Sequence, residues 1–171
     1  MKLTILMAQT ADGKIAKASD HPANWTSKED KAFFVEETKK HGVIIMGANT
    51  YKTIGRPLPG RLNVVLASKD RRTFEEISGQ LEYFDGEPAD IVRELSHRGF
   101  ASAILGGGAY TNAMFLKAGL VEEILLTVEA KIFGKGISFA DGLDSDIDLQ
   151  LMDVRRLGTN TVLLHYKIQQ Y

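Results

Sequence analysis

Short, continuous apolar runs that alternate with helical segments constrain the fold of this chain most. Val43–Met46 is apolar at every position and lies between Gly42 and Gly47, which is typical of a strand buried on both faces. The same reasoning predicts strands at 3–8, 63–67, 101–105 and 123–129, and helices at 27–41, 48–54, 87–97 and 110–118. This alternation predicts an α/β fold with a central, mostly parallel twisted sheet and flanking helices on both faces.

The C-terminal part of the chain has a different pattern. Residues 149–157 and 161–169 are predicted to be two strands joined by a turn at Gly158-Thr159-Asn160, and therefore an antiparallel hairpin added to the sheet. The 171 residues contain no repeat and no long Pro/Gly/Ser-rich linker, so we expect one domain over residues 1–171.

The composition excludes several kinds of chemistry. The chain has no cysteine, which rules out disulfides, thiolate nucleophiles and zinc sites built on sulfur. Its four histidines are far apart and lack the spacing that places two ligands on one helix face or strand, so no metal site is predicted. A formal net charge of −1 disfavours nucleic acid as a partner. We expect a small-molecule substrate.

The N-terminal apolar run bears on the location of the protein. Residues 3–8 are too few to span a membrane, and Gln9-Thr10 ends the run too early for a signal sequence. We therefore expect a cytoplasmic protein that does not contact a membrane. A monomer is favoured, and a homodimer is the alternative.

Two glycine-led loops follow predicted strands, at Gly47 and at Gly106-Gly107-Gly108. In open parallel sheets, ligands bind beyond the carboxyl ends of the strands. Each loop runs into a helix N-terminus, where free N–H groups and the helix dipole favour phosphate, so a dinucleotide pyrophosphate is a suitable ligand. The spacing matches neither a Rossmann fingerprint nor a P-loop, and a plain strand-to-helix turn is the alternative.

The segment at residues 43–63 reads VIIMGANTYKTIGRPLPGRLN. This segment resembles the dihydrofolate reductase family nearly residue for residue. The shared features are an apolar strand, Met-Gly, a Thr, an aromatic residue and Ile-Gly-Arg-Pro-Leu-Pro-Gly-Arg. Further matches follow in order: Ala8, Asp12-Gly13-Lys14-Ile15, Trp25 with Asp30, Phe34, Thr38, the three-glycine turn and Thr127. The resemblance implies a single-domain dihydrofolate-reductase-like fold and transfer of a hydride from NADPH to 7,8-dihydrofolate, giving tetrahydrofolate.

The resemblance implies a catalytic group of Asp30, Trp25 and Thr127. Asp30 would hydrogen-bond the pterin ring and support protonation of its imine nitrogen, and the Thr127 hydroxyl would join that network. Trp25 would close the site through its indole and an ordered water. The implied substrate-binding positions are Leu6, Met7, Ala8, Phe34, Ile54, Leu58, Arg61 and Leu105, with Arg61 for a folate carboxylate. The implied cofactor-binding positions are Ala8, Ile15, Gly47, Asn49, Thr50, Ser68, Lys69, Gly106, Gly107, Gly108, Ala109 and Tyr110.

Asp30 also has a purely structural interpretation. Ser27-Lys28-Glu29-Asp30 fits a capping box, in which the carboxylate at the third helical position binds the backbone N–H of the N-cap residue. In that case the carboxyl would be tied to its own helix and would not face a ligand.

Some segments depart from the dihydrofolate reductase pattern. Ala48 stands where many bacterial members carry an arginine for the 2′-phosphate of NADPH, so NADH is an alternative cofactor, and Ser68, Lys69 and Arg71 are candidate replacements for the arginine. The segment from Gly106 to Ile124, followed by Gly134-Lys135-Gly136, resembles the riboflavin-pathway reductase domain. An enzyme like 5-amino-6-(5-phosphoribosylamino)uracil reductase is therefore an alternative, as is a non-catalytic nucleotide- or folate-binding module.

Overall fold

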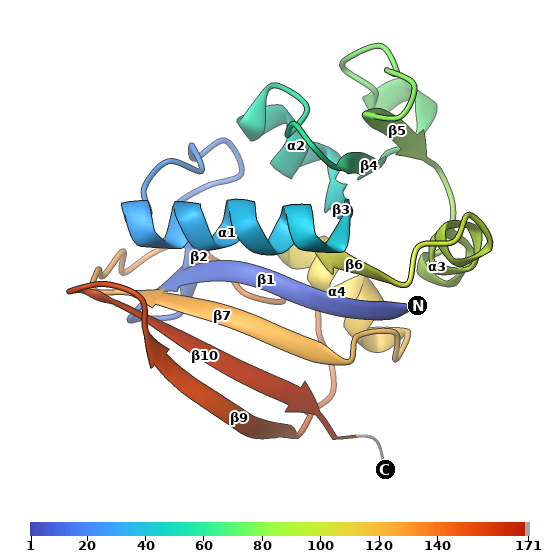
Figure 1. The fold of residues 1–171 in the computed structure, drawn as a ribbon. Coiled ribbons are helices and arrows are strands. Elements are labelled where there is room, and N and C mark those ends of the chain that lie inside the picture. Colours follow the sequence, from blue (N-terminus) through green and yellow to red (C-terminus); the bar gives the residue numbers. More distant parts are fainter. Residues whose placement is uncertain (170–171) are drawn as a thin grey trace.

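The protein is described by a computed structural model that covers residues 1–169. Within them an eight-stranded sheet has the order β5-β4-β3-β6-β1-β7-β10-β9 (Figure 1). Its strands are β1 (Lys2–Thr10), β3 (Val43–Gly47), β4 (Leu62–Leu66), β5 (Leu81–Phe84), β6 (Ser102–Leu105), β7 (Glu123–Glu129), β9 (Leu149–Arg156) and β10 (Thr161–Ile168). A second sheet pairs β2 (Lys14–Ala16) with β8 (Ile137–Ser138). The helices are α1 (Lys28–His41), α2 (Ala48–Ile54), α3 (Pro88–His97) and α4 (Ala109–Lys117), with a 3-10 turn η1 (Lys69–Arg71).

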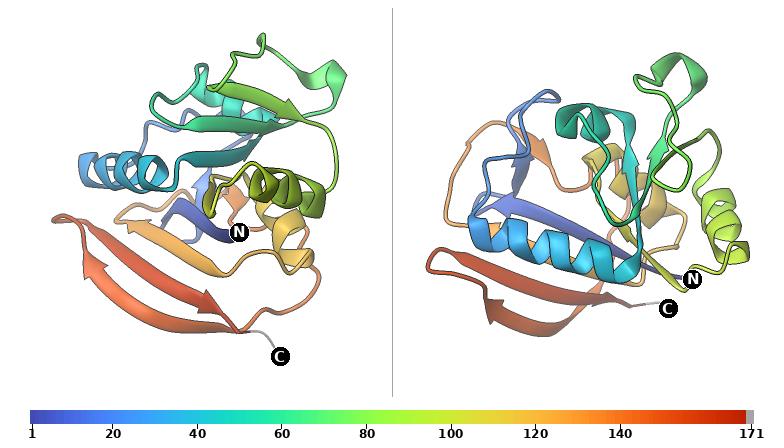
Figure 2. Two further views of the ribbon diagram at one scale, coloured as in Figure 1. Left: turned by 45° about the vertical axis from the view of Figure 1, so that its right-hand side comes forward. Right: turned by 45° about the horizontal axis from the view of Figure 1, so that its top comes forward.

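The strands from β5 to β7 run parallel, and β10 and β9 are antiparallel additions. This confirms the predicted α/β fold with a C-terminal hairpin. The connections through α1 and α2 step toward β4, whereas those through α3 and α4 step back toward β7. Because such crossovers are right-handed, the two pairs of helices lie on opposite faces of the sheet (Figure 2).

The core confirms that the central strands are buried on both faces. In β3, Val43 and Ile45 belong to the cluster under α3 and α4, and Ile44 and Met46 belong to the cluster under α1 and α2. Successive side chains of a strand point to opposite faces, so a fully apolar run supplies both clusters at once.

Three short strands were not among the predicted elements. β5 has four residues, and β2 pairs with β8 across more than a hundred residues of sequence, so neither leaves a periodic signal. Asp12 accepts hydrogen bonds from the backbone N–H groups of Phe133 (3.1 Å) and Gly134 (2.7 Å) and so fixes the turn before β2. None of the helices within residues 1–169 is long and apolar enough to cross a membrane.

Candidate active site

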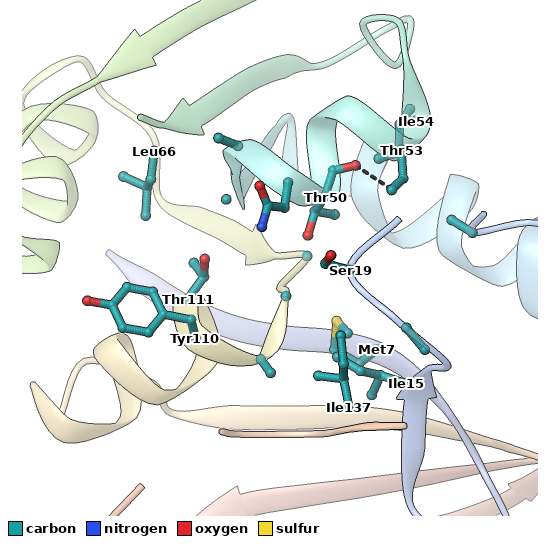
Figure 3. Close-up of a pocket in the computed structure, with 18 of the residues that line it drawn as sticks. Met7, Ile15, Ser19, Thr50, Thr53, Ile54, Leu66, Tyr110, Thr111 and Ile137 are labelled. Carbon is teal, nitrogen blue, oxygen red and sulfur yellow. Dashed lines mark hydrogen bonds between the residues drawn. The ribbon is translucent and has the colours of Figure 1, made fainter. Parts of the chain in front are cut away.

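A large cavity lies at the carboxyl ends of the parallel strands and has a volume of about 1050 Å³. Figure 3 shows Met7, Ile15 and Ile137 gathered on one side of it, Thr50 of α2 opposite them, and Tyr110 and Thr111 of α4 on a third side. The predicted site residues that line it are Leu6, Met7, Ala8, Ile15, Trp25, Asp30, Phe34, Gly47, Asn49, Thr50, Ile54, Leu58, Ser68, Gly106, Gly108, Ala109 and Tyr110. The structure therefore brings together residues that the sequence places far apart.

Asp30 lies in the first turn of α1 and is 7% exposed. Its Oδ1 accepts a hydrogen bond from the Thr127 hydroxyl at 2.5 Å. Half of the capping box is present, because the Asp30 N–H donates to Ser27 Oγ at 3.1 Å. The other half is not, because the Ser27 N–H donates to Glu129 Oε1 at 2.8 Å. The Asp30 carboxyl is thus left to line the cavity.

Burial raises the pKa of the Asp30 carboxyl above its ordinary value of 3.8. Hydrogen bonds from the Thr127 and Thr26 hydroxyls act in the opposite direction, the negative charge of Glu129 raises the pKa further, and the charge of Lys31 lowers it. A carboxyl with a raised pKa in a cavity is suited to acid or relay chemistry, because it holds its proton at higher pH than an exposed carboxyl does.

The raised pKa also predicts an effect on stability. Between pH 3.8 and the raised pKa, the folded state binds more protons at Asp30 than the unfolded state, so this group's contribution to the free energy of unfolding falls as pH rises. At pH values above the raised pKa, the full free-energy cost of burying the ionised Asp30 carboxylate is present. We expect Asp30→Asn to be more stable than the wild type at pH 7, with the difference vanishing below pH 3.8. Thermal melts across pH 3–8 measure this, and an equal Tm for the two proteins at pH 7 would contradict it.

Trp25 lies in the loop between β2 and α1 and is held by contacts with the segment after β7. Its ring packs edge-on against Phe133 with centroids 5.0 Å apart, and its carbonyl oxygen accepts from Lys131 Nζ at 2.6 Å. These two contacts place the indole at the cavity wall. The sequence patterns indicated Trp25 but not Phe133 or Lys131.

The glycine loops close together at one side of the cavity. The Gly47 N–H donates to the Gly107 carbonyl at 2.8 Å, and a Cβ on Gly47 would lie 2.5 Å from Thr111 Oγ1. Gly108 is the N-cap of α4 and makes no side-chain capping bond. The absence of side chains lets a ligand approach the free backbone N–H groups at the start of α4, which is a favourable position for phosphate.

Arg71, beyond the end of β4, and Asn49 of α2 lie together at another part of the cavity lining. Arg71 Nη2 donates to Asn49 Oδ1 at 2.9 Å, and both residues line the cavity together with Ser68. Lys69, which the resemblance implied, is not among the lining residues. Of the two candidate cations beyond this strand, the structure brings Arg71 to the cavity.

Four further predicted residues also lie outside the lining. Thr127 and Gly107 each bind a residue that lines the cavity: Thr127 donates to Asp30, and the Gly107 carbonyl accepts from Gly47. Leu105 is fully buried in the cluster under α3 and α4 and does not line the cavity, because the last residue of β6 points to that face. Arg61 is 5% exposed, and its Nη1 donates to the Pro59 carbonyl at 2.9 Å.

Glu129 is the residue near the site that sequence reasoning missed most clearly. It follows Thr127 by two positions, so both side chains leave the same face of β7. That period-2 relation to a residue already singled out is the one signal that could have found it. Within residues 1–169, no group of three or more histidine or acidic side chains is arranged to hold a metal ion.

Solved structures share this architecture. RibD from Acinetobacter baumannii matches with a TM-score of 0.83 and 16% identity, covering 99% of this chain and 58% of that one. Dihydrofolate reductase from Enterococcus faecalis, solved in complex with NADP(H), matches with a TM-score of 0.67 and 21% identity, covering 99% and 97%. At these identities the likeness shows the fold alone: it is the α/β fold of dihydrofolate reductase, which also occurs in part of the RibD chain.

The sequence comparison goes further. The profile of the family described as dihydrofolate reductase matches residues 2–141. This chain belongs to the dihydrofolate reductase family of oxidoreductases. Dihydrofolate reductase from Bacillus subtilis is 38% identical over 73 residues, covering 43% of this chain and 42% of that protein. The chain thus spans about half the length, or less, of the first curated relatives that it matches.

Proposed function

We propose that this protein reduces 7,8-dihydrofolate to tetrahydrofolate with NADPH as hydride donor. The observation that carries the proposal is the buried Asp30 carboxyl, which is bound to Thr127 and lines the cavity instead of capping α1. A ring that binds beside this carboxyl meets the apolar side chains of Leu6 and Phe34, which line the same cavity. Such a pocket, apolar with one placed polar group, suits a flat heterocycle.

The chemistry requires a hydride at the imine carbon of the ring and a proton at the imine nitrogen. NADPH, when bound, supplies the hydride. Negative charge develops on the nitrogen as the hydride arrives, so a proton must be delivered to it. Asp30, with its raised pKa, holds or relays that proton, Thr127 fixes the orientation of its carboxyl, and Trp25 limits access of water.

The residues present fit a dinucleotide. Glycines at 47 and 108 keep side chains out of the space between Thr111 of α4 and Thr50 of α2, beside the start of α4, where phosphates are favoured. Arg71, Ser68 and Asn49 line another part of the cavity. Arginine and hydroxyl donors suit a 2′-phosphate, which supports NADPH over NADH although Ala48 supplies no cation.

This cofactor assignment predicts the effect of Arg71→Ala. We expect the Kd for NADPH to rise about 10- to 100-fold, the usual range for loss of a hydrogen bond to a charged group, and the Kd for NADH to stay unchanged. Nicotinamide fluorescence titration measures both constants. Arg93→Ala is a matched control, because Arg93 is an exposed arginine on α3 that pairs with Asp90 and does not line the cavity. An equal loss of affinity for the two cofactors would count against a 2′-phosphate contact.

A second substrate is favoured by one observation. Arg61, the cation expected for the folate carboxylate, is buried against Pro59 and does not line the cavity, whereas Lys31 does. A substrate with a phosphorylated ribose, such as 5-amino-6-(5-phosphoribosylamino)uracil, would place its anion elsewhere and would not need Arg61. The alternative function is therefore reduction of this ribosylaminopyrimidine at its sugar carbon.

One assay separates the candidates. Purified protein is mixed with NADPH and either dihydrofolate or the ribosylaminopyrimidine phosphate, and the nicotinamide absorbance is followed. Turnover of dihydrofolate alone supports the proposal, and turnover of the pyrimidine alone selects the alternative. Cofactor binding without turnover of either substrate would indicate a binding module. Tight binding of methotrexate, which needs a pterin pocket with an acidic anchor, is the second measurement.

A further inference from the structure

Glu129 is a carboxylate buried at the end of β7, where it is 3% exposed and lies outside the cavity lining. A buried carboxylate is costly unless hydrogen bonds compensate it. Its two oxygens have separate partners: Oε1 accepts from the Ser27 N–H at 2.8 Å, and Oε2 lies 3.0 Å from the Thr161 hydroxyl. The group is therefore built into the structure with defined contacts.

The contact with Ser27 joins Glu129 to the helix that carries Asp30. Ser27 is the N-cap of α1, and its Oγ accepts the Asp30 N–H and lies 2.9 Å from the Thr161 hydroxyl. The N-terminus of a helix is the positive end of its dipole, which favours a carboxylate at this place. Glu129 thus occupies the one cap donor that a capping-box carboxylate would use.

β7 holds the first turn of α1 at two points on one face of the strand. Thr127 binds the Asp30 carboxyl, and Glu129, two residues further on, binds the backbone of the cap. The register fixes both points, because Ala8 of β1 is opposite Thr127 and Thr161 of β10 is opposite Glu129.

We propose that Glu129 is the positioning residue that keeps the Asp30 carboxyl in the cavity, by binding the Ser27 N–H that this carboxyl would otherwise turn back to bind. The inference deepens the proposed function and rests on it for its kinetic consequence. Without Glu129, the free Ser27 N–H recruits Asp30, the capping box closes, and the contact with Thr127 is lost.

The test compares two substitutions. Glu129→Ala removes the acceptor, and we expect kcat to fall about 10- to 100-fold, the scale of a small misplacement of a reacting group, with the Kd for NADPH unchanged. Glu129→Gln keeps an oxygen for the Ser27 N–H, so kcat should stay close to wild type. Glu123→Gln is the matched control, because this carboxylate lies on the same face at the other end of β7 and pairs with Lys2 and His165.

A titration of the Asp30 carboxyl by carbon NMR needs no substrate. The charges acting on Asp30 are those of Glu129 from β7 and Lys31 from α1. Both Glu129 variants remove a negative charge, so Glu129→Gln, which keeps the Thr127 contact, should lower the midpoint. Glu129→Ala also exchanges the Thr127 hydrogen bond, which lowers the pKa, for one from the Ser27 N–H, so its midpoint should differ from that of Glu129→Gln. The control should leave the midpoint unchanged.

The outcomes are distinct. Wild-type kcat in Glu129→Ala, or an equal fall in Glu129→Ala and Glu129→Gln, overturns the positioning role. If Glu129→Ala does not fold, the test uses Asp30→Asn and the NMR resonance of the Ser27 amide. Because this N–H binds Glu129 and not Asp30, its chemical shift in Asp30→Asn should equal that of the wild type. A large displacement of this resonance overturns the proposal. If the titrations are as expected but the protein does not reduce dihydrofolate, the proposed function is wrong and the positioning role of Glu129 still stands.

Discussion

Asp30→Asn is expected to lower kcat for dihydrofolate reduction by about 10²- to 10⁴-fold, the usual contribution of a placed acid or base. The amide has the same size as the carboxyl and can still pair with the Thr127 hydroxyl, but it cannot hold and release a proton. The Kd for NADPH should not change, since the glycine loops and Arg71 line other parts of the cavity. Steady-state kinetics and fluorescence titration measure the two quantities.

The pH profile sharpens this expectation. In the wild type, kcat/KM should fall as pH rises through the raised pKa of Asp30, because the proton-bearing form is lost there. The Asn variant should lose that limb of the profile. Asp146→Asn, at an exposed position before β9, is the control and should match the wild type. An Asn variant that keeps full activity would remove Asp30 from the mechanism.

Gly107→Ala is expected to lower the stability of the protein. The Gly107 backbone has φ +80°, and a Cβ there would lie 2.7 Å from Met7 Sδ and 2.9 Å from Met7 Cε. Left-handed backbone costs an alanine roughly 1–2 kcal/mol, and overpacking adds about 1 kcal/mol, the low end of its usual range, because Sδ and Cε are the flexible end of the Met7 side chain. At roughly 2–4 °C for each kcal/mol in a chain of this size, Tm should fall by about 4–12 °C.

The same substitution should weaken cofactor binding, because Met7 lines the cavity and would be pushed toward it. Gly119→Ala provides the matched control: this residue has φ +64° with no atom within 4 Å of the added Cβ. Gly119→Ala should lose only the free energy that the left-handed backbone costs, and it should bind NADPH as the wild type does. Equal losses of Tm in the two variants would show that contact with Met7 is not the cause.

The sequence predicted those elements whose conformation depends on residues within the same segment. The apolar run Val43–Met46 predicts a strand buried on both faces, and Ser27 predicts the start of a helix that the structure begins at Lys28. The segment at 43–63 indicated the family, and the pattern Trp25 with Asp30 indicated two cavity-lining residues. Each of these signals is short in sequence, because the interactions behind it act within a few residues.

Only the tertiary structure decided which way the Asp30 carboxyl turns. The sequence allowed two partners, and the choice depends on Glu129, which comes from a strand 102 residues away from Ser27. The same holds for Leu105, whose face depends on its place in β6, and for Arg61, whose guanidinium is buried against Pro59. A backbone N–H binds the acceptor that the fold brings within hydrogen-bond distance. The spacing of residues along the chain does not reveal which strands come together only in the folded protein.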